Sequence, residues 1–593
     1  MKQKLDQIKW HKYFIKWLVI STLIGVVCGL SSIIFIAAIK AVTGLLLGTI
    51  AQYSPPTAGG EGGYTTPLSL GVPYLIPVVT TLGGLLSGLV VSRFAPEAEG
   101  VGTDAAIRAF HKEEAKIRPR VPIVKLFASA LTIGSGGTSG REGPIAQIGA
   151  GAGSFIASTL KLDKKSRQIA LAAGLGAGIA SIFKAPLAGA IIGAEIFYTH
   201  DFEVEALIPG FIASVVGYSI VGYATGWQPV FSANVNPIEY RNPWSLPLYS
   251  ILGVFCAGLA LFTFRVYFPI TRTFKTWRTP LYVKTAFGGL LTGLIGMMIP
   301  SVLGTGYGWV QIALDKNYGL FPPLLILAAI FAEIISLSFT LGSGGSGGIF
   351  GPSVVTGGLL GIATGLAFNT LFPSIAPNPT DFALVGMMAF FAADAKAPLS
   401  TIVLIAEMTG GYGLLAPSMF AVTPAFLLSG KQSVFPSQYP TRHDSPAHQE
   451  EFETLVLSRT TVEETMSKNV ITVPTDASLA TAYRIMQEHS LGGLPVVDAS
   501  NRLAGIVTKG DVLKVPEAER EKQSVEAIMT RKVVVALPDD DLYSCLKKMT
   551  IKEIGRLPVV ASDNSFKVIG IVTRSDIGRI IETRSEPANA SST

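Results

Sequence analysis

The chain is organised around one stretch, GSGGTSGREGP at Gly134–Pro144, because a second stretch repeats it. The repeat reads GSGGSGGIFGP at Gly342–Pro352, and seven of its eleven positions are identical. Downstream of each, KAPLAGAIIGAE at Lys184–Glu195 matches KAPLSTIVLIAE at Lys396–Glu407. The two pairs of motifs are offset by 208 and 212 residues, so chance explains them poorly. The sequence therefore predicts two homologous halves.

The chain divides by charge near Gly430. Residues 1–430 hold 27 Lys and Arg and 19 Asp and Glu, whereas the remaining 163 residues hold 20 and 22. Hydrophobic residues make up 49% of the chain and its mean hydropathy is +0.46, which exceeds what a soluble core needs. We expect a membrane part at 1–430, a final pore segment and linker at 431–462, and a soluble part after it. Apolar segments recur at about 17–49, 73–94, 121–133, 144–160, 167–198, 204–224, 245–270, 283–303, 321–340, 352–372, 381–395 and 398–430.

Several of these apolar segments are shorter than the roughly 20 residues that a straight membrane span requires. Unwound backbone is tolerated inside a membrane only where protein or a cavity satisfies its polar groups. The sequence thus predicts an all-α polytopic protein with broken helices and two inverted-topology repeats, at about 13–225 and 245–430. Basic residues among positions 2–16 place the N-terminus in the cytoplasm. We expect a multi-pass cell-membrane protein with both termini on that side.

The two glycine-rich loops have the composition of an anion site. Backbone N–H groups at a helix N-terminus offer partial positive charge without a full cation, so they hold a small anion and release it again. Glycine lets the backbone approach the ion, and proline in the first helical turn sacrifices no hydrogen bond. Alternatively, the glycines only let helices pack closely. The duplicated cluster with proline at the same end favours an anion pathway.

Glu142 is the most informative residue of the first loop. Between Leu126 and Leu160 the only other charged residue is Arg141. An ionisable group inside a membrane is a functional candidate, because its presence there is energetically unfavourable. An ionised Glu142 would occupy an anion site, and a protonated one would move away and open it. The alternative is that Glu142 and Arg141 form a neighbouring pair that faces water.

These motifs resemble the CLC family of chloride channels and proton–chloride exchangers, over roughly residues 13–440. The resemblance implies a homodimer in which each subunit has its own pore, with Glu142 as the gating glutamate. It implies backbone donors for the anion at Ile349 and Phe350. The full set of anion-site candidates is Val101, Gly102, Arg141, Gly143, Gly348, Ile349, Phe350 and Phe435.

The chain departs from the family pattern at three positions. Val101 stands where the first anion loop usually carries a serine, and Phe435 stands where the family has a tyrosine. We therefore expect weak discrimination between chloride and other small anions. Ile196 stands where exchangers usually carry an internal proton glutamate, which leaves Glu195 as the candidate proton relay. The sequence favours a glutamate-gated, voltage- and pH-dependent chloride channel, with a proton-coupled chloride antiporter as the alternative.

The soluble part contains a second repeat. Each unit runs from a Met-Ser-Lys or Met-Thr-Arg opening through LPVV to GIVT-x-x-D, which predicts a small α/β module at 463–515 and again at 526–583. The pattern resembles a regulatory CBS-domain pair, followed by a disordered tail at 584–593. Such a pair binds the ribose of an adenine nucleotide through Thr and Asp, and each Asp is alternatively a helix cap. The matching residues are Thr508, Asp511, Thr573 and Asp576.

Two other function classes fit the sequence less well. A CBS-bearing cation transporter, for magnesium for example, needs acidic ligands near the midplane, whereas the paired loops present helix N-termini. A membrane enzyme needs a nucleophile–base or metal-ligand cluster, and the apolar part has none in its sequence pattern. We expect no enzymatic activity, metal, pore cofactor or nucleic-acid partner. The expected partners are a small anion, protons, the lipid bilayer and a second copy of the chain.

Overall fold

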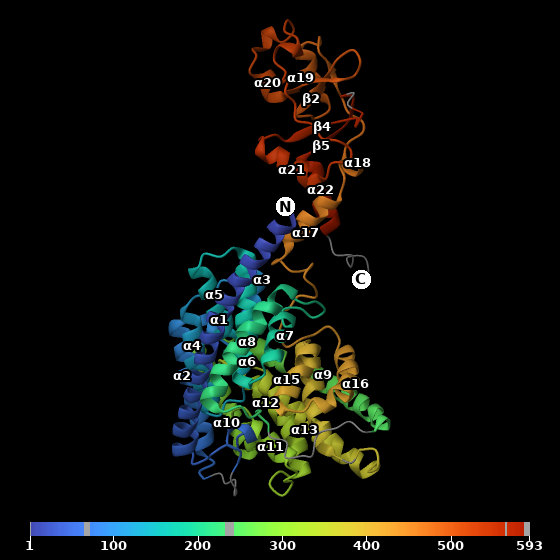
Figure 1. The fold of residues 1–593 in the computed structure, drawn as a ribbon. Coiled ribbons are helices and arrows are strands. Elements are labelled where there is room, and N and C mark those ends of the chain that lie inside the picture. Colours follow the sequence, from blue (N-terminus) through green and yellow to red (C-terminus); the bar gives the residue numbers. More distant parts are fainter. Residues whose placement is uncertain (1, 65–70, 232–241, 377, 564–565, 586–593) are drawn as a thin grey trace. The chain divides into compact units, whose positions relative to one another are not determined.

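The computed structural model describes residues 2–64, 71–231, 242–376, 378–563 and 566–585. Apart from its first two residues, the predicted disordered tail lies outside the described residues. The chain forms two compact units, Met1–Ala447 and His448–Thr593. Figure 1 shows a helical first unit and a second unit of short helices and strands. The mostly helical membrane part and the small α/β domains after it confirm the predicted fold class.

The helices of the first unit fall into two series. Among the described residues, eight helical stretches are long and apolar enough to cross a membrane, and shorter apolar helices accompany them. The first series is α1 (Lys2–Thr43), α2 (Leu75–Phe94), α3 (Gly102–Lys112), α4 (Arg120–Gly134), α5 (Glu142–Thr159), α6 (Lys164–Phe183), α7 (Pro186–Glu195) and α8 (Leu207–Thr225). The second is α9 (Leu246–Thr276), α10 (Leu281–Met298), α11 (Tyr307–Leu314), α12 (Pro323–Gly342), α13 (Phe350–Leu371), α14 (Pro379–Ala395), α15 (Pro398–Thr409) and α16 (Leu415–Leu428).

The two halves break their helices in the same way. The predicted segment 167–198 is two helices, because Lys184 ends α6 with a left-handed φ of 56° and Pro186 starts α7. Lys396 ends α14 with a φ of 57°, and Pro398 starts α15. Proline fits the first turn of a helix and cannot continue the preceding one, which is why the chain restarts there. The expected apolar segments also leave out α3, which is amphipathic and contains charged residues, and α11, which is only eight residues long.

Glycines bring the helices of each half into backbone contact. A Cβ atom added to Gly149 of α5 would lie 2.1 Å from the carbonyl oxygen of Gly174 in α6. In the other half, a Cβ added to Gly357 of α13 would lie 2.4 Å from the carbonyl oxygen of Gly386 in α14. Small residues permit this close approach between membrane helices. Within the helices, close packing therefore explains the glycines.

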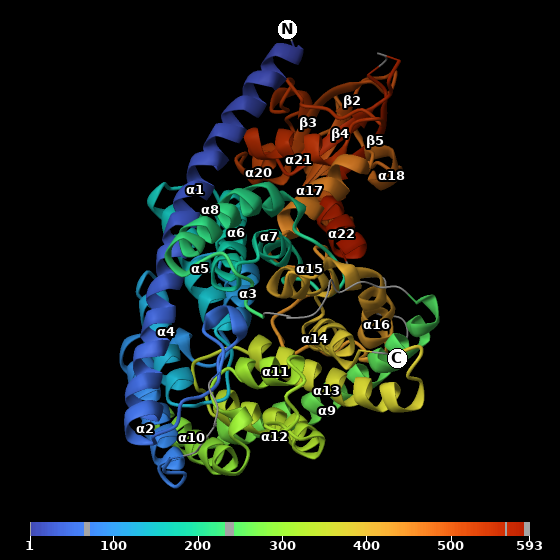
Figure 2. The same cartoon turned by 60° about the horizontal axis from the view of Figure 1, so that its bottom comes forward.

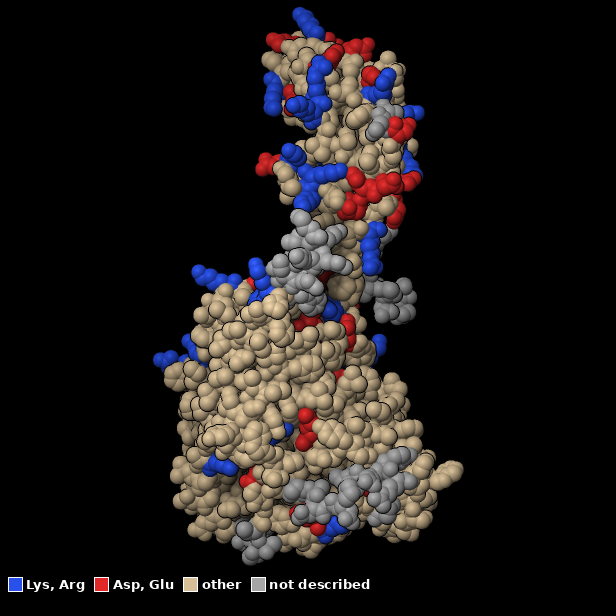
Figure 3. All heavy atoms as spheres, viewed as in Figure 1, with Lys and Arg blue, Asp and Glu red and all other residues tan. Residues whose placement is uncertain are grey.

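The surface of the first unit suits a bilayer. On the face seen in Figure 3 few charged side chains interrupt its tan surface, whereas Lys, Arg, Asp and Glu are dense on the second unit. The long helix α1 runs along the first series of helices, against α4, α5, α6 and α8 (Figure 2). Its exposed residues include Phe14, Val19 and Ile34, which are apolar. This is the surface expected of a multi-pass membrane protein.

The second unit repeats one α/β arrangement. Strand β2 (Gly493–Val497) pairs antiparallel with β3 (Leu503–Thr508), and β4 (Arg556–Val560) pairs in the same way with β5 (Val568–Thr573). The other elements are α17 (Gln449–Arg459), α18 (Val462–Thr465), β1 (Val473–Pro474), α19 (Leu479–Glu488), α20 (Lys509–Leu513), α21 (Leu542–Ile551) and α22 (Arg574–Ser585). Each half has its own buried apolar cluster. The expected linker is helical in α17, and residues before His448 belong to the first unit.

Candidate anion pathway

The two glycine-rich loops contact each other through their backbones. The Gly140 N–H donates to the carbonyl oxygen of Gly348 over 2.8 Å, and the Gly348 N–H donates to Ser139 Oγ over 2.9 Å. A third unwound segment, just before α3, joins them. Its Gly102 N–H donates to the carbonyl oxygen of Gly347 over 3.1 Å. Segments more than 200 residues apart in the sequence thus form one site.

The carboxylate of Glu142 lies between the two loops. Glu142 is the first residue of α5 and only 4% exposed. A Cβ added to Gly140 would lie 2.1 Å from its Oε2, and a Cβ added to Gly348 would lie 2.3 Å from its Oε1. The same Cβ atoms would lie 2.5 Å from the backbone nitrogen of Gly351 and 2.6 Å from that of Gly143, so only glycine fits at these two positions.

Backbone N–H groups from both halves face this carboxylate. They belong to Gly143, Phe350 and Gly351, at the N-termini of α5 and α13. Among the described residues, none of them reaches the carboxylate with regular hydrogen-bond geometry. Two helix N-termini that converge on one carboxylate form a place where an anion is favoured.

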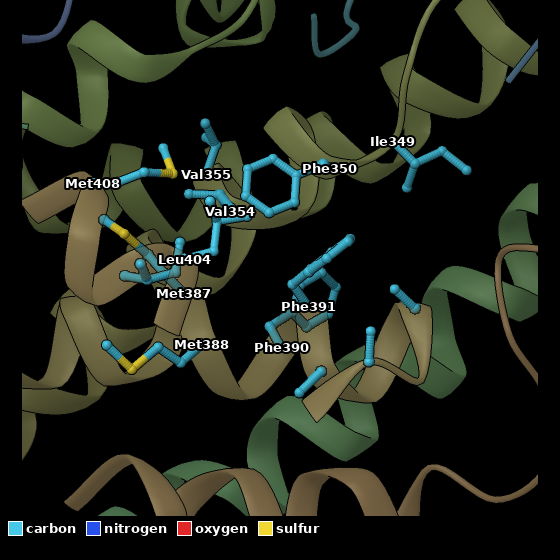
Figure 4. Close-up of a cluster of buried hydrophobic side chains, with 14 of the residues drawn as sticks. Ile349, Phe350, Val354, Val355, Met387, Met388, Phe390, Phe391, Leu404 and Met408 are labelled. Atoms are coloured by element: carbon cyan, nitrogen blue, oxygen red, sulfur yellow. The ribbon is translucent and has the colours of Figure 1, made fainter. Parts of the chain in front are cut away.

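Phe350 is available to an anion only through its backbone. Its ring packs in a buried apolar cluster, 5.1 Å from the ring of Phe183 and 4.5 Å from that of Phe391, measured between centroids. Figure 4 shows the Phe350 ring beside Val354 and Val355, and the side chain of Ile349, farther from them, belongs to the same buried cluster. Ile349 precedes α13 and has no side-chain cap. The N–H groups at the start of this helix therefore remain directed at the site.

Arg141 is buried and pairs with a residue that the sequence analysis did not find. Its guanidinium forms an ion pair with Glu61, in the loop between α1 and α2. It also lies 5.5 Å from the ring centroid of Phe183 and 5.4 Å from that of Tyr307. The alternative in which Arg141 and Glu142 pair with each other facing water is therefore wrong. Glu61 lies 80 residues away in a glycine-rich loop, where no periodic signal identifies it.

Val101 is the N-cap of α3, and a buried lysine stabilises the segment around it. Lys125 of α4 is 0% exposed and donates to the carbonyl oxygens of Ala98 over 3.1 Å and Gly100 over 2.7 Å. In the other half the same offset of 208 residues leads to Glu333 of α12. Glu333 is 1% exposed, and neither of its oxygens has a hydrogen-bond partner among the described residues. The offset of 208 residues between the repeats is the sequence signal that could have identified Lys125 and Glu333 as an equivalent pair.

Phe435 lies in a segment that is attached to the same region. The Val434 N–H donates to the carbonyl oxygen of Asp394 over 3.0 Å. Ser437 donates to Asp104 of α3 through its N–H over 2.9 Å and through its hydroxyl over 3.0 Å. Asp104 follows Val101 by three residues, so these contacts hold the segment that contains the buried Phe435 at the start of α3. Residues 431–447 therefore belong to the helical unit, beyond the compositional break near Gly430.

Two cavities with different linings border this site. One, of about 310 Å³, is lined by the end of α1 and by Glu61, Arg141 and Tyr307. The other, of about 710 Å³, reaches Gly100 and Val101 beside the end of α2. Cations of the larger cavity are Arg108, Arg272, Lys275 and Lys284, and its acids are Glu97, Glu99 and Asp104.

Glu195 faces the second half and caps one of its helices. Its carboxylate accepts hydrogen bonds from the N–H groups of Leu399 over 3.0 Å and Ser400 over 2.7 Å, at the start of α15. Glu407 returns the interaction at the start of α7, where it accepts from Leu187 over 3.2 Å and Ala188 over 2.8 Å. Each helix therefore ends in the carboxylate that caps the other. Ile196, one position later, is fully buried and apolar.

The second unit holds the Thr–Asp pairs at two equivalent helix starts. The Thr508 hydroxyl donates to Asp511 over 2.6 Å, and the Asp511 N–H approaches the Thr508 hydroxyl oxygen at 3.3 Å. Thr573 and Asp576 make the same two contacts at 2.6 Å and 3.3 Å. These contacts form a capping box in which Thr508 is the N-cap and Asp511 the third helical residue, so the Thr and not the Asp is the cap. They leave the adenine-nucleotide interpretation as a prediction.

Comparison with known proteins groups these motifs together. Residues 83–430 match the family described as Voltage gated chloride channel, and residues 462–518 and 525–582 each match the CBS domain. The H(+)/Cl(-) exchange transporter ClcA of Cronobacter sakazakii is 30% identical over 431 residues, covering 70% of this chain and 86% of that protein. The protein of the same name from Klebsiella pneumoniae is 30% identical over 435 residues, covering 70% and 85%.

Solved structures agree with this grouping at the level of the fold. A slow cyanobacterial Cl-/H+ antiporter superposes with a TM-score of 0.61 at 24% identity, covering 70% of this chain and 94% of that one. A eukaryotic CLC transporter superposes with a TM-score of 0.56 at 21% identity, covering 95% and 98%. The family match spans more than half of the sequence. The chain therefore belongs to the voltage-gated chloride channel (CLC) family and carries a C-terminal pair of CBS domains.

Proposed function

We propose that the chain is a proton-coupled chloride exchanger in which Glu142 alternates with the transported anion. The observation that carries the proposal is the position of the Glu142 carboxylate, between Gly140 and Gly348 and facing N–H groups of both halves. In the sequence, Ile196 favours a channel, because exchangers usually carry a glutamate at this position. The relatives named as H(+)/Cl(-) exchange transporters favour the alternative.

The geometry supplies a simple exchange step. While ionised, the Glu142 carboxylate fills the place where the N-termini of α5 and α13 converge. Protonation removes its negative charge and so weakens its attraction to these helix ends. The side chain then moves off, and a chloride ion takes the same backbone donors. Because one place serves carboxylate and anion in turn, movement of the proton and of the anion become linked.

Reconstituted protein tests the proposal. In liposomes with a chloride gradient and no proton gradient, the wild type should move protons uphill as chloride moves down. Glutamine keeps the shape of protonated Glu142 but carries no exchangeable proton, so Glu142→Gln should pass chloride without protons. Chloride movement without protons in the wild type would identify a channel. No chloride movement at all would remove the transport proposal.

Assembly and orientation belong to the same proposal. We place both termini in the cytoplasm and pair two copies through the exposed apolar side chains of α7, α15 and α16. Leu187, Leu399 and Phe420 are large, apolar and at least 43% exposed there. A contiguous apolar surface of this kind suits lipid or a second copy. A dimeric mass in detergent, reduced to a monomeric mass by Leu399→Trp, supports the pairing, and a monomeric wild type contradicts it.

A further inference from the structure

The loop between α1 and α2 holds Glu61 in a fixed position over Arg141. The Gly59 N–H donates to Gln311 Oε1 over 3.1 Å, and the Gly60 N–H donates to the carbonyl oxygen of Val230 over 3.0 Å. A Cβ added to Gly60 would lie 1.8 Å from the carbonyl oxygen of Pro229, so only glycine fits there. These contacts place Glu61 against Arg141 from outside the two glycine-rich loops.

Arg141 and Tyr307 keep unused donors beside this ion pair. Arg141 is 6% exposed, and its Nε has no hydrogen-bond partner among the described residues. The same holds for the buried hydroxyl of Tyr307. Both side chains line the cavity of about 310 Å³, and Tyr307 is close enough to interact electrostatically with Glu61 and Glu142. Buried donors are normally satisfied, so these two indicate an absent acceptor.

The remaining charges around Glu61 also favour an anion. Lys184 interacts electrostatically with Glu61, and Lys40 lines the same cavity. Glu61 is 24% exposed on its side chain and so remains within reach of water. Without Glu61, the charged residues among the described lining of the cavity would be the cations Lys40 and Arg141.

We propose that Arg141 and Tyr307 form an outer site for a small monovalent anion, for which Glu61 is a tethered competitor. The proposal deepens the exchange function and rests on anion transport through the Glu142 site. An anion that enters the cavity displaces Glu61 from Arg141 and accepts from Arg141 Nε and the Tyr307 hydroxyl. It then lies directly outside Glu142. Two carboxylates thus compete with the anion one after the other. Glu61 competes for the Arg141 guanidinium, and Glu142 competes for the backbone N–H groups.

A purely structural role for Glu61 makes a different prediction. Glutamine at this position keeps a carbonyl oxygen for Arg141 but loses the charge that competes with an anion. Glu61→Gln should therefore lower the apparent KM for chloride, about two- to fivefold for an ion pair of this exposure. The fall should occur only on the face reached by the α1–α2 loop. A structural clamp would give no change, or a loss of flux from both faces.

The experiment uses excised membrane patches with separate perfusion of the two faces. Chloride-dependent currents of the wild type, Glu61→Gln and the control Glu114→Gln are compared at each face. Glu114 is a suitable control because it forms an exposed ion pair with Lys116 and neither residue lines the two cavities. A KM that is unchanged or raised in Glu61→Gln at the loop face overturns the proposal. The test needs chloride current alone, so a wild type without proton coupling refutes exchange but leaves this test intact.

Crystals soaked in bromide give a second measurement that does not depend on transport. Glu61→Gln should show anomalous density beside Arg141 Nε and the Tyr307 hydroxyl, and the wild type should show less. Absence of density in the variant at saturating bromide overturns the outer site. If Glu61→Gln does not fold, the same soak of Glu61→Ser, which removes both charge and reach, decides the question.

Discussion

The two halves of the membrane unit share a scaffold but differ in the side chains at its centre. Gly136 and Gly344 adopt φ angles of +100° and +99°. Glu195 of α7 caps the start of α15, and Glu407 of α15 caps the start of α7. At the helix starts, however, the first half has Arg141 and Glu142, whereas the second has Ile349 and Phe350. The repeat thus builds two converging helix N-termini. Two neighbouring differences in sequence give only the first half charged side chains at this point.

The largest effect should come from removing the charge that distinguishes the halves. Glu142→Gln should abolish proton movement and the pH dependence of chloride flux, because the amide neither ionises nor transfers a proton. Phe350→Leu, at the equivalent place in the other half, should keep both, since that position contributes through its backbone. Proteoliposome fluxes at several pH values measure this. A glutamine variant with wild-type pH-dependent flux would refute the gating role.

Next in size is the loss of space at the shared site. In Gly348→Ala the new methyl group would lie 2.3 Å from Glu142 Oε1 and 2.6 Å from the backbone nitrogen of Gly143. We expect chloride flux to fall by more than about tenfold, equivalent to about 1.4 kcal/mol. Gly258→Ala is the matched control, because nothing lies within 4 Å of a Cβ added there. Equal fluxes for the two variants would contradict the site.

The sequence predicted the parts of this site that are encoded locally or by repetition. The duplicated loops identified the two halves, and Glu142 stood out as a lone acid in an apolar run. The reciprocal caps of Glu195 and Glu407 had a signal in their matched positions, but only packing shows which helix each carboxylate meets. The pair of Arg141 and Glu61 had none, because a long-range contact made by an irregular loop leaves no periodic pattern.

The reciprocal caps should both stabilise the protein, with the larger effect at Glu195. Glu195→Gln and Glu407→Gln each remove a carboxylate that accepts from two helix N–H groups, and an N-terminal cap contributes about 0.5–2 kcal/mol. The Glu195 carboxylate also accepts from the Ser400 hydroxyl, so thermal unfolding in detergent should shift down further in Glu195→Gln. If Glu195 also relays protons, only Glu195→Gln should stop proton movement in liposomes. A larger loss of stability in Glu407→Gln would contradict the ranking of the two caps.

The CBS repeat offers the same comparison in the soluble unit. Asp511→Ala and Asp576→Ala each remove the carboxylate that accepts from the N-cap threonine, a contribution of about 1 kcal/mol, and should destabilise this unit by similar amounts. We propose that the pair binds an adenine nucleotide through these residues, so both variants should also weaken binding of ATP, ADP or AMP. Calorimetry on the full chain in detergent measures the binding. A wild type that binds none of the three would leave only the capping role.

The smallest effect should come from a hydroxyl that the first half lacks and the second has. Val101 lies between Gly100 and Gly102, and Thr305 lies between Gly304 and Gly306 in the matching loop. Val101→Ser would add a donor at the N-cap of α3, next to the larger cavity. Hydrogen bonds to a charged group contribute about 1.5–3 kcal/mol, and much of this is offset by removing the new hydroxyl from water. We therefore expect the preference for chloride over nitrate to rise only a few-fold.

Thr305→Val makes the reverse exchange in the other half. Thr305 lines the smaller cavity on the side of Arg141 and Tyr307, where a guanidinium already dominates the interaction with an anion. Its loss should leave the ratio of chloride to nitrate flux unchanged. Bi-ionic reversal potentials compare both variants with the wild type. If Thr305→Val changes selectivity more than Val101→Ser does, the loop around Thr305 selects the anion. The loop around Val101 would then have the smaller influence, which is the reverse of this prediction.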